Sequence, residues 1–186
     1  MKNETSVLER LLGFYHPCFD LKRPFAVGEM VYDAYAFCDV TSSRYVLIEK
    51  AELWRAYTFE HVFFRETDLF SESELQEYER QLREQIEPEF VRKGQKYPIP
   101  DHMCTYLTGI FICRQAVSGD TVRAIRKHRF RLNYRFALRG YCESRLVVLD
   151  LGKKQIYGNA AAKPLAKRLK QQLTSLEFDI ITGGKI

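Results

Sequence analysis

The chain has 186 residues and a mass of 21.9 kDa, and 46% of its residues are hydrophobic and 28% charged. These values are those of one globular domain, large enough to bury roughly 70% of its unfolded surface. The 13 Phe and 11 Tyr residues exclude a mostly disordered chain, because so many rings could not all stay hydrated. No uncharged apolar run approaches the roughly 20 residues of a spanning helix, so we expect no membrane partner.

The cysteines and the N-terminal segment indicate a cytoplasmic protein. The start, MKNETSVLERLLGFYHPCF, lacks the basic region and unbroken apolar stretch of a signal peptide. A disulfide framework normally has an even number of cysteines, and this sequence has five, without a CxxC motif. We therefore expect reduced thiols at Cys18, Cys38, Cys104, Cys113 and Cys142.

The net charge of +5 is unevenly distributed along the chain. Residues 1–90 hold 10 basic and 18 acidic groups, whereas residues 91–186 hold 19 basic and 6 acidic groups. The change falls in RKGQKYPIPD, residues 92–101, which we interpret as a loop inside one domain. Internal pairing of an acidic helix with basic strands, the commoner arrangement, and an external anionic partner both explain this division.

The first half of the chain predicts a short helix followed by strands. Apolar residues at helical spacing predict a helix over residues 6–14, and the segment HPCFDLKRPF after it is irregular. Strand-rich composition then predicts a hairpin of residues 30–40 and 45–50 around a turn at 41–44. Further strands are expected at residues 53–54 and 57–65.

The middle of the chain predicts two helices and a central strand. Ser71 and Glu74 form a capping-box pattern at the start of a helix that Pro88 stops or kinks. Residues 103–113 are apolar on both alternations, which is typical of a strand covered on both faces. Ser118 is expected to cap a short helix.

The segment from His128 to Arg139 alternates most regularly. It predicts one strand with Phe130, Leu132, Tyr134, Phe136 and Leu138 in the core and a basic outer face. Residues 145–151 and 155–157 are expected to form a hairpin, and residues 163–173 a last helix with Pro164 in its first turn. The tail, residues 177–186, is expected to be loosely ordered.

Together these elements predict a single α+β domain over residues 1–186, with a mainly antiparallel sheet built from hairpins and helices packed against it. The side chains expected in its core are Phe37, Leu47, Leu82, Ile110, Phe130, Tyr134, Phe136 and Val148.

The outer face of the 128–139 strand is the first candidate binding site. Residues two apart on a strand lie roughly 7 Å apart, so its arginines would form a ladder of fixed positive charges that suits phosphate oxygens. The candidate ligands of an anion are Arg129, Arg131, Arg135 and Arg139, together with Lys163 and Lys167 of the last helix. Because the aromatic residues would point to the opposite face, we expect no reading of bases. Pairing of these arginines with the 71–90 helix or with Glu143 is the commoner alternative.

Metal and catalytic sites have weaker support. The two H-x-C pairs, His16–Cys18 and His102–Cys104, lack the usual zinc spacing, so we expect no metal site. Asp39 with Glu49 and Lys50 resembles a metal-dependent nuclease pattern, but Glu49 and Lys50 are adjacent and would point to opposite sides of a strand.

Common catalytic signatures are absent from the sequence. It contains no GxSxG, P-loop, GxGxxG or HExxH motif, so no cofactor is expected. His61 lies in an apolar strand, where a hydrogen-bonded structural histidine is the usual role. The absence of these signatures favours a protein that is not an enzyme.

Several segments resemble a family of uncharacterised single-domain proteins from Gram-positive anaerobes. They are DAYAFCDVTSSRYVLIEKAELW, EHVFF, HMCTYLTGIFIC and FRLNYRFALRGYCESRLVVLDLGKKQIYGN, within residues 30–160. The resemblance implies a shared α+β fold and brings no activity, so no residue role follows from it.

Three hypotheses of function remain. The first is a non-enzymatic module that binds nucleic acid or another polyanion on its basic sheet face. The second is a structural or protein-interaction domain with internally paired charges, and the third is a metal-dependent nuclease. Homo-oligomer formation is left open by the sequence.

Overall fold

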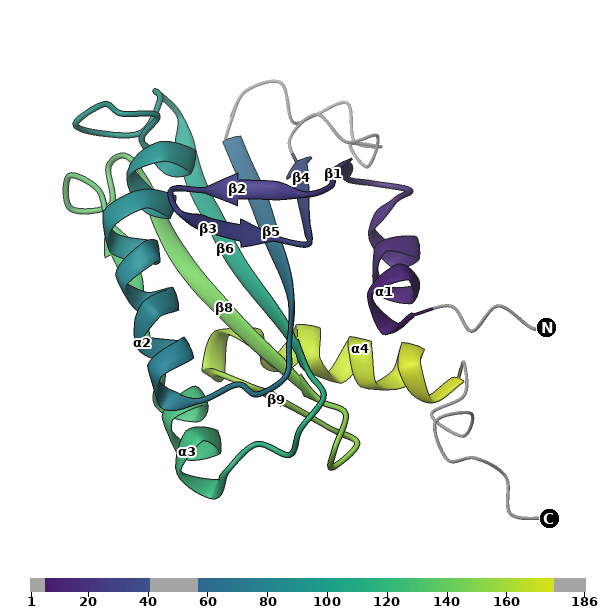
Figure 1. Cartoon of the computed structure of the whole chain (residues 1–186). Helices are drawn as coiled ribbons and strands as arrows, with labels where there is room; N and C mark the ends of the chain where they lie inside the picture. The colour runs from purple at the N-terminus through teal and green to yellow at the C-terminus, as the bar shows by residue number, and fades with distance from the viewer. Residues whose placement is uncertain (1–5, 41–56, 176–186) are drawn as a thin grey trace, which may run out of the picture.

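A computed structural model of the chain describes residues 6–40 and 57–175. In this part of the chain, a seven-stranded sheet has the order β1-β4-β5-β6-β8-β7, with β9 also paired to β8 (Figure 1). Its strands are β1 (Asp20–Lys22), β4 (Ala34–Asp39), β5 (Tyr57–Thr67), β6 (His102–Cys113), β7 (Arg131–Asn133), β8 (Tyr141–Asp150) and β9 (Gln155–Gly158). A separate ribbon pairs β2 (Phe25–Val27) with β3 (Met30–Tyr32).

The sheet is mixed, so the prediction of a mainly antiparallel sheet was wrong. β5 pairs with β6 in parallel and β6 pairs with β8 in parallel, whereas the outer strands pair antiparallel. Parallel neighbours need a crossover, and helices between β5 and β6 and between β6 and β8 supply it. The two helices predicted between strands were the available signal for this arrangement.

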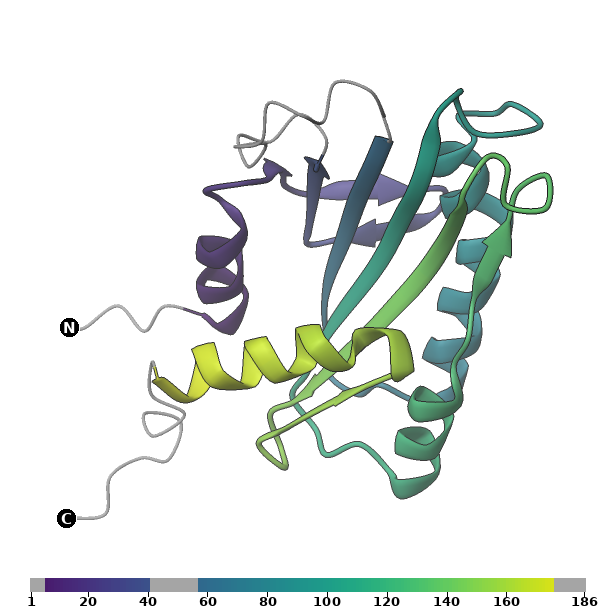
Figure 2. The ribbon, with the colours of Figure 1, turned by 180° about the vertical axis from the view of Figure 1, so that it is seen from behind.

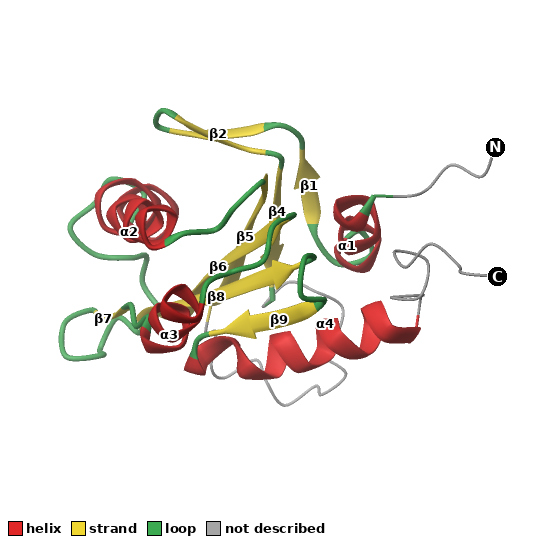
Figure 3. Ribbon diagram, turned by 60° about the horizontal axis from the view of Figure 1, so that its bottom comes forward, coloured by secondary structure: helices red, strands yellow, loops and turns green. Residues whose placement is uncertain are grey.

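Helices lie on both faces of the sheet. One face carries α2 (Glu72–Gln81), its π-helical continuation η2 (Leu82–Val91) and α3 (Gly119–Lys127) (Figures 1 and 3). The other face carries α1 (Val7–Tyr15) and α4 (Lys163–Ser175), which follows the 3₁₀ turn η3 (Ala160–Ala162) (Figure 2).

The predicted caps at Ser71 and Ser118 are confirmed, and Ser6 caps α1 in the same way. The hydroxyls of Ser6, Ser71 and Ser118 each accept a hydrogen bond from the backbone N–H three residues later. The carboxylate of Glu74 receives its hydrogen bond from Arg65, at 3.1 Å. Pro88 does not end its helix, because the chain continues as a π-helix to Val91.

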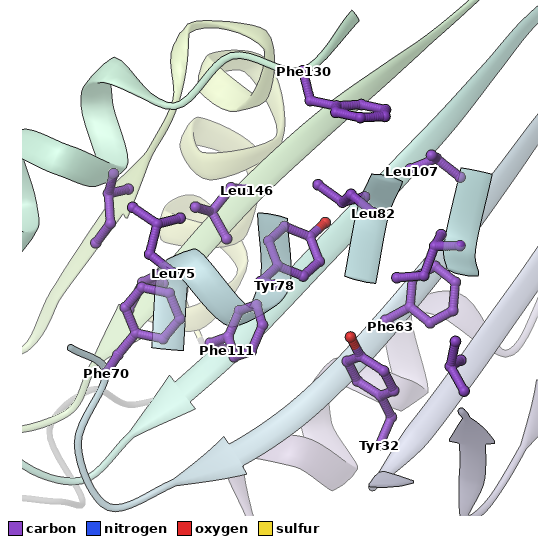
Figure 4. Packing of buried hydrophobic residues seen from close by; sticks show 14 of the residues in the cluster. Tyr32, Phe63, Phe70, Leu75, Tyr78, Leu82, Leu107, Phe111, Phe130 and Leu146 are labelled. Atoms are coloured by element: carbon purple, nitrogen blue, oxygen red, sulfur yellow. The ribbon is translucent and has the colours of Figure 1, made fainter. Parts of the chain in front are cut away.

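The larger core lies between α2 and the sheet. Figure 4 shows Tyr78 and Leu75 of α2 facing Phe111 and Phe70, which are all buried. Of the side chains predicted in the core, Leu82, Ile110, Phe130, Tyr134 and Val148 are buried and Phe37 is partly buried. Leu47 lies outside the described residues, as do the 41–44 turn, the 45–50 strand, residues 53–54 and the 177–186 tail.

The long strand predicted over residues 128–139 is not formed. β7 spans only Arg131–Asn133, and the chain then turns through Arg135, Phe136 and Ala137, whose φ angles are 49°, 55° and 68°. Gly140 follows with φ 69°, and a Cβ there would clash with the carbonyl groups of His102 and Met103. The turn places Phe136 at the surface with 101% exposure, and Leu132 and Leu138 are exposed as well, so the predicted core positions of these three residues were wrong.

Three shorter elements differ from the prediction. The segment expected to be irregular contains β1 and the first residue of β2, and the strand expected over residues 30–40 is divided into β3 and β4 at Asp33. The 145–157 hairpin is confirmed as β8 and β9, and the strand over 57–65 as β5.

A first prediction concerns Gly109 of β6, over which Tyr78 packs. A Cβ at this position would lie 2.7 Å from the Tyr78 hydroxyl oxygen. We expect Gly109→Ala to lower the free energy of unfolding by about 1–3 kcal/mol, because the buried ring must move. The matched control is Gly13→Ala in α1, where a Cβ meets nothing within 4 Å. It should raise stability by about 0.5–1 kcal/mol through helix propensity. Urea unfolding of both variants measures the difference, and equal effects would contradict the packing argument.

A second prediction concerns His61 of β5, whose Nδ1 lies 2.7 Å from the Tyr35 hydroxyl. Burial lowers the pKa of His61 to about 3, from 6.5. Between pH 6.5 and 3 the unfolded chain binds a proton there and the folded chain does not. The contribution of neutral His61 to the free energy of unfolding is therefore fully present above pH 6.5 and is lost as the pH falls towards 3.

The variant His61→Gln keeps hydrogen-bonding atoms and cannot titrate. Between pH 7.5 and pH 5 we expect the free energy of unfolding to fall by about 2 kcal/mol less in this variant than in the unaltered protein. Urea unfolding at several pH values measures it. The comparison at pH 7.5 isolates the effect of the altered hydrogen bond. Parallel pH profiles of the two proteins would show that His61 is not responsible.

Candidate functional site

The sheet face that carries α1 and α4 changes from apolar to polar along its strands. Under the helices, the register aligns Ala34, Phe64, Ile110 and Val147 across four strands. Towards the start of β5, β6 and β8, the corresponding row is Glu60, Tyr106, Glu143 and Arg131. No described helix lies over this second half of the face (Figure 2). We call it the open half-face.

Two arginines stack on two tyrosines of the open half-face. The guanidinium carbon of Arg145 lies 3.4 Å from the ring centroid of Tyr106, and that of Arg131 lies 4.0 Å from the ring centroid of Tyr141. The two tyrosine hydroxyls lie 3.4 Å apart. The hydrogen bond with Tyr141 and burial raise the pKa of Tyr106, so its hydroxyl stays protonated. These four residues form one arginine–tyrosine row.

Two carboxylates flank this row. Glu60 accepts hydrogen bonds from Thr108 at 3.0 Å and from Arg145 at 3.3 Å. Glu143 lies 3.5 Å from Arg131, whose side chain is 51% exposed. An ion pair this exposed contributes little to stability, so Arg131 can exchange Glu143 for another anion at low cost.

The ladder of arginines that the sequence predicts on one strand is not formed. Of its members, only Arg131 lies on β7, while Arg135 and Arg139 lie in the turn before β8. Arg135 instead lies over the ring of Tyr97, 5.8 Å from its centroid. Lys163 and Lys167 are exposed on α4, at the other end of the face. Within residues 6–40 and 57–175, no carboxylate pairs with Arg129, Arg135, Arg139, Lys163 or Lys167.

The aromatic residues of this face were missed. We expected the rings to point only into the core, yet Tyr106 and Tyr141 share the face of Arg131. The alternation of Tyr141, Glu143 and Arg145 against Cys142, Ser144 and Leu146 was the signal available in the sequence. The side of the sheet on which it falls depends on the crossovers, which local periodicity does not show.

The acidic helix, formed by α2 and η2, pairs with partners away from the open half-face. Its carboxylates contact Arg65, Arg80, Arg92 and His128. It therefore neutralises its own side of the sheet and leaves the arginine–tyrosine row to Glu60 and Glu143.

A buried serine and a buried histidine under α2 meet a partly exposed glutamate of that helix. His128 Nε2 lies 3.1 Å from the Ser144 hydroxyl, and Nδ1 lies 2.7 Å from Glu79. These distances are those of a nucleophile, a base and an orienting acid. Ser144 is completely buried and also lies 3.4 Å from the Tyr78 hydroxyl, so no substrate reaches it in this packing. The arrangement is therefore a structural hydrogen-bond network.

Metal ligands are not gathered in the described part of the chain. There, no three His, Cys, Asp or Glu side chains come close enough to share an ion. His102 of the second H-x-C pair instead contacts the Arg139 carbonyl at 2.9 Å and the Thr105 hydroxyl at 2.8 Å. Glu49 and Lys50 of the nuclease-like pattern lie outside the described residues.

None of the described helices is both long and apolar enough to cross a bilayer.

A match to a protein-family model shows which family the chain belongs to. The model described as a domain of unknown function, DUF8052, matches residues 3–171. The chain belongs to this family. No curated protein and no solved structure matches it. The match confirms the predicted resemblance to an uncharacterised family and assigns no activity to any residue.

A third prediction concerns the five cysteines, which are all unpaired. Cys18 is exposed and the other four are buried, and burial raises the pKa of Cys113 and of Cys142 to about 11. Because the thiolate is the reactive form, an aromatic disulfide reagent at pH 8 should modify one thiol quickly in the folded protein. It should modify five in urea.

The control is Cys18→Ser, which should abolish the fast phase. Fast modification of several thiols in the folded protein would contradict the packing of β6 and β8.

Proposed function

We propose that the chain is a non-enzymatic module that binds a single-stranded, phosphate-rich nucleic acid on its open half-face. The arginine–tyrosine row of Arg131, Tyr141, Tyr106 and Arg145 carries this proposal. Proteins that bind single strands combine arginines for the phosphates with aromatic and guanidinium planes on which bases stack.

The row supplies both kinds of contact. Arg131 lies on an edge strand and its side chain is half exposed. A base can therefore stack on the outer plane of its guanidinium, or a phosphate can accept hydrogen bonds from the guanidinium edge. Tyr141 and Tyr106 support the guanidinium planes of Arg131 and Arg145, which extend the stacking surface towards the middle of the sheet. A single strand laid along this row would cross β7, β8 and β6.

Further cations lie next to β7 in the chain and at the other end of the face. Arg129, Arg135 and Arg139 belong to the same segment as β7, and Lys163 and Lys167 lie on α4. Residues 91–186, which hold all of them, carry 19 basic against 6 acidic groups. This excess favours an anionic partner and raises the rate of encounter with it.

A second candidate is a structural or protein-interaction domain whose charges are paired internally. The Glu60–Arg145 and Glu143–Arg131 pairs favour it, since they neutralise both arginines of the row. The two candidates differ in whether Arg131 leaves Glu143 for an external phosphate.

The test is the binding of a fluorescein-labelled oligo-dT strand, followed by anisotropy over a range of salt concentrations. Arg129→Ala with Arg131→Ala should make the slope of log K against log salt shallower by about 1.4, because each phosphate contact contributes roughly 0.7. Tyr141→Leu should leave the slope unchanged and weaken binding by about 1–3 kcal/mol, the contribution of one stacked base.

The matched control is Arg123→Ala with Arg126→Ala, which removes two exposed charges from α3 on the opposite face. It should change neither quantity. Absence of binding at low salt would exclude the proposal and favour the internally paired domain. Equal effects of the two arginine pairs would show attraction to net charge without a site.

A further inference from the structure

A cavity of about 300 Å³ lies beside the open half-face, between α1, α4 and the sheet. Its size is at the small end of the range for small-molecule sites. Aromatic rings from α1 and the turn after it form one wall, and apolar side chains of α4 form another. Glu60 of β5 and Arg145 of β8 contribute from the sheet. A mixed lining of this kind suits a small molecule with one apolar and one polar end.

The charges of the lining favour an anion. It holds two arginines, Arg145 and Arg168, and one carboxylate, Glu60, so its net charge is +1. Glu60 pairs with Arg145 at 3.3 Å. Arg168 is exposed on α4 and forms no ion pair in the described part of the chain. One guanidinium is therefore available to a ligand, and the second becomes available if it releases Glu60.

An unpaired buried hydroxyl marks the same place. Tyr15 of α1 lines the cavity with only 7% of its surface exposed, and its hydroxyl has no hydrogen-bond partner among the described residues. Buried polar atoms are rarely left unpaired in folded proteins. Burial first, and then the charge of Glu60, raise the pKa of Tyr15, while Arg145 and Arg168 lower it. The hydroxyl is thus a protonated donor near the charged lining of the cavity.

We propose that this cavity binds a small organic anion, a carboxylate or a phosphate attached to an apolar body. Arg168 and Arg145 hold the anionic group, and the rings of Phe14 and Phe19 pack against the apolar body. The Tyr15 hydroxyl donates to the anion after a small shift of the side chains that cover it. This site does not depend on the proposed nucleic-acid surface, although Arg145 borders both.

Isothermal titration calorimetry with benzoate and phenylphosphate tests the site and separates a carboxylate from a phosphate ligand. We expect saturable one-to-one binding of at least one of them. Benzylamine and benzyl alcohol, the cationic and neutral probes of similar shape, should bind at least about tenfold more weakly, the contribution of one charged hydrogen bond.

Three substitutions give effects of different sign. Arg168→Gln should weaken binding of the anion about tenfold or more. Glu60→Gln should strengthen it several-fold, because it removes the competing carboxylate and keeps an acceptor for Thr108. Tyr15→Phe should weaken it while leaving the melting temperature equal or higher, since it deletes an unpaired buried polar atom.

The matched control is Arg126→Gln on α3, an exposed arginine on the opposite face, which should leave binding unchanged. Arg131→Ala, which weakens the nucleic-acid surface, should also leave it unchanged, so the two proposals can fail separately. Absence of saturable binding of both anions at millimolar concentration would overturn the proposal. Equal effects of Arg168→Gln and Arg126→Gln would overturn it too.

Discussion

The parallel pairing of β5, β6 and β8 decides which face of the sheet is available for binding. Parallel neighbours cannot be joined by a tight turn, so the chain returns through α2 and η2 after β5 and through α3 after β6. The three strands follow one another in the same direction across the sheet. Crossovers of the usual right-handed kind then fall on the same face, and here both do. The larger core and the acidic helix are consequently on one side, and the other side is left to the two ends of the described chain.

The second face is only partly covered, and its composition changes where the cover ends. α1 and α4 bury the apolar half, where Phe64, Ile110 and Val147 lie. From Thr108 towards the start of β6 the side chains on this face become polar. Arg145 of β8 pairs with Thr108 in the sheet register and so lies at this boundary. It contacts Tyr106 on the open half-face and Glu60 beside the cavity. One arginine thus joins the two proposed binding surfaces, so a ligand that draws it from Glu60 would alter both.

Buried polar contacts hold the turn that displaced the predicted strand. His102 contacts the Arg139 carbonyl at 2.9 Å, and the Tyr134 hydroxyl donates to Glu87 at 2.6 Å. Glu87 is buried and also pairs with Arg92 at 2.8 Å. These contacts fix both ends of the turn to β6 and η2, whereas the apolar alternation of Phe136 and Leu138 gains no burial from it. Backbone and polar constraints therefore outweigh the hydrophobic pattern in this short segment.

The amino-acid sequence by itself determined the helices, the 145–157 hairpin and the family. Serine caps, helical spacing and the hairpin at Gly152 depend on neighbours in the chain, and those predictions agree with the helices and with β8 and β9. The mixed sheet and the arginine–tyrosine row were decided only by the tertiary structure. The row takes Arg131, Tyr141 and Arg145 from β7 and β8 and Tyr106 from β6. Period-two alternation states which residues of one strand share a face, but not which strand lies beside it or in which direction. The crossover helices set that order, because each must bury its apolar face against the sheet, and here both do so on the same side.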